Sequence, residues 1–81
     1  MKKLNIEILN DAIATEFEVP VEVIQPDANI LQTLDLDSMR VMSLVVLVKR
    51  HTGIMLPIRH LQQFTTFRIL YDYIEQHLNT L

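Results

Sequence analysis

Apolar residues recur near the start of the chain with the period of an α-helix. Four of them are separated by three, four and four residues, which places them on one helical face: Ile6, Leu9, Ile13 and Phe17. Pro20 follows soon afterwards and limits the extension of a helix. We therefore predict a first helix that ends near position 16.

The next segment, residues 18–37, loses this period and contains turn-forming residues such as Pro20, Pro26 and Asn29. It nevertheless keeps apolar residues that can anchor it to a core: Val23, Ile24, Ile30, Leu31, Leu34 and Leu36. Long loops are uncommon in compact domains unless they have a role. The pattern therefore predicts a long, anchored loop with a function.

The most apolar segment of the chain follows this loop, and we predict a second helix over residues 38–51. Asp37 or Ser38 can cap its N-terminus, and Gly53 stands where a helix commonly stops. Pro57 can open a short third helix that reaches residues 61–63.

A fourth helix is predicted after Thr65 or Thr66, either of which can cap it. Its apolar positions again follow the three-four-four spacing: Phe67, Leu70, Ile74 and Leu78. No alternating pattern of the kind that marks β-hairpins competes with this interpretation. The 81 residues therefore predict a single all-α domain, residues 1–81, with a long loop between its first two helices and a short third helix.

Composition restricts the chemistry that such a domain can perform. The chain has no cysteine, so disulfides, thiolate metal sites and a cysteine nucleophile are excluded, and any thiol would come from a prosthetic group. A domain of this size leaves little room for an enclosed active site, which argues against an enzyme. The longest apolar run, Leu44 to Val48, is much too short to span a bilayer, so we expect a cytoplasmic protein without a membrane span.

Charge is distributed unevenly about Ser38. Residues 1–37 hold eight acidic and two basic side chains, whereas residues 38–81 hold two acidic and five basic ones. No basic patch stands beside a set of stacking aromatics, so we do not expect a nucleic-acid partner. Such a charge separation fits the orientation of protein partners.

The order of the local motifs resembles that of the acyl carrier proteins. The motifs that carry this resemblance are Glu22-Val23-Ile24, Asn29-Ile30-Leu31, Leu34-Asp35-Leu36-Asp37-Ser38-Met39, Leu56-Pro57, Phe64-Thr65-Thr66-Phe67 and Asp72-Tyr73-Ile74. The third of these is similar to the family's attachment site, whose core is Asp-Ser-Leu. The resemblance spans nearly the whole chain without an insertion and implies a four-helix bundle of the acyl-carrier type.

By this resemblance, a phosphopantetheinyl transferase moves a 4'-phosphopantetheine arm from coenzyme A onto Ser38, with Asp37 and Met39 as the flanking motif. The arm's thiol would carry an acyl group as a thioester, and acyl-loading and acyl-processing enzymes would be the further partners. The carrier itself would catalyse nothing. We expect the phosphodiester to meet unpaired backbone N–H groups at the start of the helix.

Two departures from the family pattern stand out. Asp35 replaces a glycine that usually precedes the Xaa-Asp-Ser sequence, and aspartate tolerates unusual backbone conformations better than most residues. The second helix lacks the strong acidity of fatty-acid carriers, which favours a specialised polyketide, secondary-metabolite or atypical fatty-acid pathway. The predicted docking surface combines hydrophobic and basic side chains: Met39, Arg40, Met42, Val46, Lys49 and Arg50.

Several alternatives remain open at this stage. The chain could be an aminoacyl or peptidyl carrier, or an unmodified carrier-like scaffold, and Met42 could be a core residue. His51, His60 and His77 lie far apart in the sequence, so we predict no metal site. An aliphatic guest could lie among the apolar side chains Val45, Leu47, Val48 and Phe67. A monomer is the default expectation for a mobile carrier.

Overall fold

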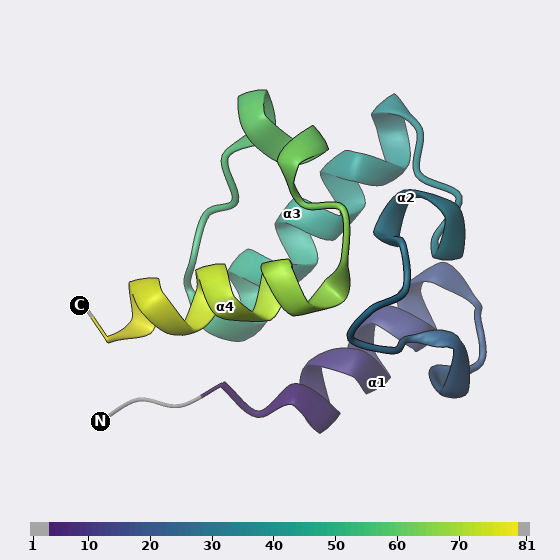
Figure 1. The fold of residues 1–81 in the computed structure, drawn as a ribbon, viewed down its shortest axis with the longest axis horizontal. Coiled ribbons are helices and arrows are strands. Elements are labelled where there is room, and N and C mark those ends of the chain that lie inside the picture. Colours follow the sequence, from purple (N-terminus) through teal and green to yellow (C-terminus); the bar gives the residue numbers. More distant parts are fainter. Residues whose placement is uncertain (1–3, 80–81) are drawn as a thin grey trace.

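The structure is a computed structural model that describes residues 4–79. Its elements, in chain order, are α1 (Ile6–Phe17), η1 (Val21–Val23), α2 (Ile30–Thr33), α3 (Ser38–Thr52), η2 (Ile58–Gln63) and α4 (Phe67–Leu78), where η denotes a 3₁₀-helix. Figure 1 shows α1 and α4 in the lower part of the view, with α3 crossing behind α4 and η2 at the top. The prediction of an all-α bundle with a long first connection and a short third helix is confirmed, but the segment predicted as a loop, residues 18–37, contains the short helices η1 and α2.

The helix boundaries follow local capping chemistry. The side chains of Asn5, Asp37 and Thr66 cap the N-termini of α1, α3 and α4. Gly53 ends α3 in the left-handed conformation, with a φ of 79°, and its N–H donates to the Lys49 carbonyl at 2.8 Å. The sequence therefore contains most of the signals that start and stop the helices.

The core forms one continuous cluster to which α1, α3, α4 and the loops all contribute. The fully buried residues with the largest side chains are Phe67, Leu9, Ile13, Ile30, Leu34, Leu44, Leu56, Leu70, Ile74 and Val48. Ile6, predicted on the inner face of the first helix, is instead exposed. It lies in the first turn of α1.

The long loop between α1 and α3 is held against the start of α4. The N–H of Ile30 donates to the Thr65 carbonyl at 3.0 Å, and the N–H of Arg68 donates to the Pro26 carbonyl at 2.8 Å. The Arg68 guanidinium also forms an ion pair with Asp27 at 3.0 Å. Ile24, Ile30 and Leu34 are buried, whereas the predicted anchors Val23 and Leu31 are exposed. The loop is thus fixed by these three buried side chains, by Leu36, which is partly buried and packs against the core, and by hydrogen bonds to a distant segment.

The short third helix has a different character from the others. Residues 58–63 form the 3₁₀-helix η2, in which His60 departs from helical backbone angles and no residue is buried. The hydrogen bonds of a 3₁₀-helix have poorer geometry than those of an α-helix, so they hold this segment less firmly. This segment therefore covers the core without being part of it.

Candidate functional site

Ser38 is the first residue of α3, and the preceding loop fixes its position. Asp35 adopts a positive φ of 50°, which turns the chain after α2. The Leu36 N–H then donates to the Leu31 carbonyl at 3.0 Å. The expectation that aspartate tolerates the unusual backbone conformation at this position is confirmed. The turn brings Ser38 to the surface, where its side chain is exposed.

Of the two candidates for the N-cap of α3, Asp37 and Ser38, the structure has Asp37 in that position. Its Oδ1 accepts hydrogen bonds from the N–H groups of Met39 at 3.0 Å and Arg40 at 2.8 Å. Both N–H groups are therefore already hydrogen-bonded. The expectation that a phosphodiester at Ser38 meets unpaired backbone N–H groups is wrong for Met39 and Arg40. The carboxylate of Asp37 stabilises the start of α3 by itself.

The residues around Ser38 fit a covalently attached group. Among residues 4–79, the Ser38 hydroxyl has no hydrogen-bond partner, and Met39 beside it is 81% exposed. A group joined by a covalent bond needs an accessible oxygen and open space, and no enclosing pocket. Both requirements are met at this position.

Arg40 connects the start of α3 to the loop and to α1. Its Nε donates to the Leu34 carbonyl at 3.1 Å, and its guanidinium lies 5.1 Å from the centre of the Phe17 ring. This geometry is that of a cation–π contact. The side chain is half-buried. Arg40, a residue of the predicted docking surface, therefore also has a structural role beside Ser38.

The other residues of the predicted docking surface lie together on the outer face of α3. Met42 and Val46 are 46% and 49% exposed, and Lys49 and Arg50 are exposed as well. The alternative that Met42 is a core residue is therefore wrong. The opposite face of α3 supplies the core instead, through Leu44, Val45, Leu47 and Val48.

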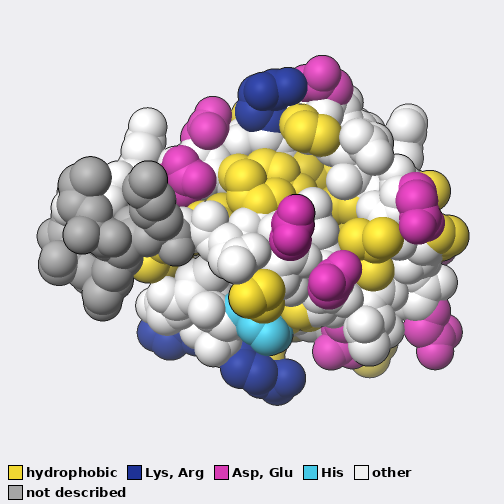
Figure 2. Space-filling model, turned by 90° about the horizontal axis from the view of Figure 1, so that it is seen from below, with side chains coloured by type: hydrophobic (Ala, Val, Ile, Leu, Met, Phe, Trp, Pro, Cys, Tyr) yellow, Lys and Arg dark blue, Asp and Glu magenta, His cyan; other side chains and the backbone are white. Residues whose placement is uncertain are grey.

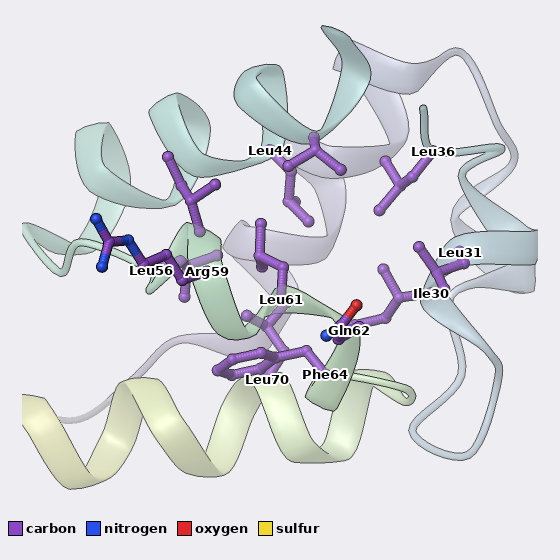
Figure 3. Close-up of a pocket in the computed structure, with 12 residues that line it drawn as sticks. Ile30, Leu31, Leu36, Leu44, Leu56, Arg59, Leu61, Gln62, Phe64 and Leu70 are labelled. Atoms are coloured by element: carbon purple, nitrogen blue, oxygen red, sulfur yellow. The ribbon is translucent and has the colours of Figure 1, made fainter. Parts of the chain in front are cut away.

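An apolar cavity of about 320 Å³ lies on the opposite side of α3 from this surface. Figure 3 shows Leu44 from α3, Leu61 from η2 and Leu70 from α4 pointing toward one another. The remaining wall comes from Ile30, Leu31, Leu36, Val41, Leu56, Ile58 and Phe64. Arg59 and Gln62 are the polar residues of the lining, and Arg59 extends its guanidinium away from the apolar cluster (Figure 3).

This cavity differs from the interior lining expected from the sequence. Val45, Leu47, Val48 and Phe67 do not line it and serve as core. Sequence reasoning missed the wall formed by Ile58 and Leu61. The sequence did contain a sign of this wall: Ile58 and Leu61 are three positions apart and therefore lie on the same face of a short helix.

Across residues 4–79, no helix combines the length and apolar character that crossing a membrane requires. In the same range, no three His, Asp or Glu side chains gather in a way that suits a metal ion.

Comparison with known proteins places residues 7–74 in register with one family. The sequence profile described as "Phosphopantetheine attachment site" matches this range, which includes Ser38 and extends from the second residue of α1 into α4. A protein named acyl carrier protein, from Syntrophobacter fumaroxidans, is 28% identical over 67 residues. That alignment covers 83% of this chain and 83% of the relative.

Proposed function

The chain belongs to the family of proteins with a phosphopantetheine attachment site, and we propose that it carries acyl groups as thioesters on an arm joined to Ser38. The covalent prosthetic group of such carriers is 4'-phosphopantetheine. The observation that supports Ser38 is its position: an exposed serine, without a hydrogen-bond partner in residues 4–79, at the first position of α3.

The chain's own residues prepare this serine for modification. Asp37 fixes the first turn of α3, and Arg40 holds the preceding loop through the Leu34 carbonyl. In a reaction catalysed by a phosphopantetheinyl transferase, the hydroxyl of Ser38 would give up its proton and its oxygen would form a phosphoester bond, while the pyrophosphate bond of coenzyme A breaks and 3',5'-ADP leaves. Once attached, the group supplies the thiol that this cysteine-free chain lacks.

The carrier contributes tethering and no catalysis of its own. A tethered substrate has a high effective concentration near each enzyme to which the carrier docks, because its search is confined to the reach of the arm. The docking surface that we propose is the outer face of α3, formed by Met39, Met42 and Val46 with Lys49 and Arg50. Because its charged members are basic, we propose partners from a specialised biosynthetic pathway.

The apolar cavity supports an acyl cargo over an aminoacyl one. Ten of its twelve lining residues have aliphatic or aromatic side chains, and these offer no partner for a charged amino group. Each buried methylene of a guest contributes about 0.8 kcal/mol. We expect an octanoyl group on the arm to raise the Tm by roughly 5–10 °C relative to a glycyl group. Equal melting temperatures by calorimetry would argue for an aminoacyl carrier.

Intact mass spectrometry tests the attachment. The chain is incubated with coenzyme A and a broad-specificity phosphopantetheinyl transferase, together with the variants Ser38→Ala and Ser43→Ala. Ser43 is a matched control, because it is also an exposed serine on α3. We expect wild type and Ser43→Ala to gain the mass of one phosphopantetheine group and Ser38→Ala to gain nothing. No gain with several transferases would favour an unmodified scaffold instead.

A further inference from the structure

A groove runs between α1 and α3, on the side of the molecule away from the apolar cavity. Two open depressions form most of it, and they share Glu16, Leu47 and Arg50. A third depression continues it past Ile8 and His51. On α3 the groove extends from residue 42 to residue 51, which corresponds to about 14 Å or roughly three helical turns.

Exposed apolar side chains border this groove. Ile8 on α1 is 57% exposed, and Met42 and Val46 on α3 are 46% and 49% exposed. Leu47, which is buried, contributes to the floor. Apolar groups that line a hollow in this way lose their contact with water only when another surface fills it.

The two rims of the groove carry opposite charges. Asp11 and Glu16 stand on the α1 rim, and Arg50 stands on the α3 rim beside the side chain of His51. Among residues 4–79, the one ion pair is Arg68 with Asp27, so these rim charges are not paired with one another. In Figure 2, a histidine and basic side chains at the lower edge lie across exposed hydrophobic atoms from acidic side chains. Each rim therefore offers its charge to a partner.

We propose that this groove binds a surface helix of a partner protein, with an apolar stripe flanked by basic residues on one edge and acidic residues on the other. The basic edge lies along Asp11 and Glu16, and the acidic edge lies along Arg50. A single amphipathic helix fills a groove of this length with side chains spaced at i, i+3, i+4 and i+7. A second copy of the chain fits less well, because two identical concave surfaces leave the hollow between them unfilled.

The groove shares Met42, Val46 and Arg50 with the docking surface proposed above, so this inference rests on that part of the proposed function and extends it to α1. It does not depend on modification of Ser38. The groove ends at Met42, about one helical turn from that serine. A helix bound there would hold its parent protein beside the attachment position. The acidic rim on α1 and the basic rim on α3 also set this surface apart from one that recognises charge of a single sign. The partner's two edges must differ in charge for both rims to be satisfied.

Three stapled helical peptides of about 14 residues serve as probes for the full-length, unmodified chain. All have the same leucine stripe, and they carry Lys on one edge and Glu on the other, Lys on both edges, or Glu on both edges. Binding is measured by fluorescence anisotropy at pH 8 and low salt. We expect the mixed peptide to bind about tenfold more tightly than either of the others, because each uniform peptide places like charges along one rim.

Charge reversal on the chain gives the decisive comparison. In Arg50→Glu both rims become acidic, so we expect the preference to move to the peptide with Lys on both edges. Arg59→Glu makes the same charge change on η2, outside the groove, and should keep the preference of the wild type. A gain of binding by a new peptide cannot arise from a variant that fails to fold.

Chemical-shift mapping of the bound mixed peptide completes the test. Perturbations at residues of α1 and α3 that border the groove would support the proposal. Perturbations at the cavity beside η2, or an equal preference in Arg50→Glu and wild type, would overturn it. Concentration-dependent dimerisation of the free chain, abolished by Arg50→Glu, would also overturn it in favour of a second copy. A positive mass gain at Ser38 in the earlier experiment would stand in each of these cases.

Discussion

Arg40 shows how one side chain serves the attachment position without being modified. Its Nε–H reaches the Leu34 carbonyl, and its guanidinium covers the ring of Phe17. A lysine keeps the charge at this position but lacks the planar donor group that satisfies both contacts. The loop before Ser38 is therefore held by geometry that arginine alone supplies.

We expect Arg40→Lys to lower the free energy of unfolding by about 1–2 kcal/mol, because the hydrogen bond to the Leu34 carbonyl is lost and the contact with the Phe17 ring is weakened. Urea unfolding measures this change, and hydrogen exchange at the Leu36 amide reports whether the loop loosens. Arg50→Lys is the control, because Arg50 is exposed and its replacement should change stability by less than about 0.5 kcal/mol. Equal effects of the two substitutions would contradict the structural role of Arg40.

Among the secondary-structure elements, α3 carries both the site and much of the core. One face of it is buried through Leu44, Val45, Leu47 and Val48, and the other is exposed from Met39 to Arg50. Its start is fixed by a single side chain, Asp37, which accepts two hydrogen bonds. The orientation of Ser38 therefore depends on this cap.

Replacing the cap separates its hydrogen bonds from its charge. Asp37→Ala removes two hydrogen bonds and should destabilise the domain by about 1–2 kcal/mol. Asp37→Asn keeps an acceptor oxygen and should cost less than about 0.5 kcal/mol. Asp27→Ala, which removes an exposed ion pair, provides a matched control with an expected loss below about 1 kcal/mol. If Asn were as damaging as Ala in urea unfolding, charge rather than capping would be the main contribution.

At the scale of the whole molecule, Tyr71 joins the last helix to the first. Its hydroxyl donates to the Asn10 side-chain oxygen at 2.5 Å, across 61 positions of sequence. Burial raises the pKa of the Tyr71 phenol above its usual value, and the hydrogen bond to Asn10 opposes this rise to a smaller extent. The folded bundle therefore favours the neutral phenol.

This shift gives a pH dependence with a definite sign. The stability that the neutral phenol contributes is fully present below the unfolded-state pKa of about 10 and is lost as pH rises from there through the higher folded-state pKa. Tyr71→Phe lacks this titration, so the stability difference between wild type and variant should shrink above about pH 10. Urea unfolding between pH 8 and pH 11 measures the difference. A constant or widening difference would refute the assignment.

Local sequence patterns were enough to predict the longer helices, because periodicity and capping depend on neighbours along the chain, whereas Ser38 as the attachment position came from the resemblance to acyl carrier proteins. Apolar spacing predicted α1 and α4, and Gly53 and Thr66 stood where their local conformations require them. Asp37 and Ser38 were placed at the start of α3 for the same reason. Asp35 was expected to tolerate its unusual backbone conformation from its chemistry alone, and its φ of 50° agrees with this.

How these elements face one another depends on long-range packing. Nothing in the sequence places Met42 outside the core, because apolar residues occur on both faces of α3 and the packing of the other helices selects which face is buried. The cavity likewise depends on where η2 lies over Leu44 and Leu70, which a 3₁₀ segment without buried residues does not specify locally. Local hydrogen bonds and periodicity depend on residues that are close in the sequence, whereas burial and the pairing of surface charges depend on contacts between residues far apart in it.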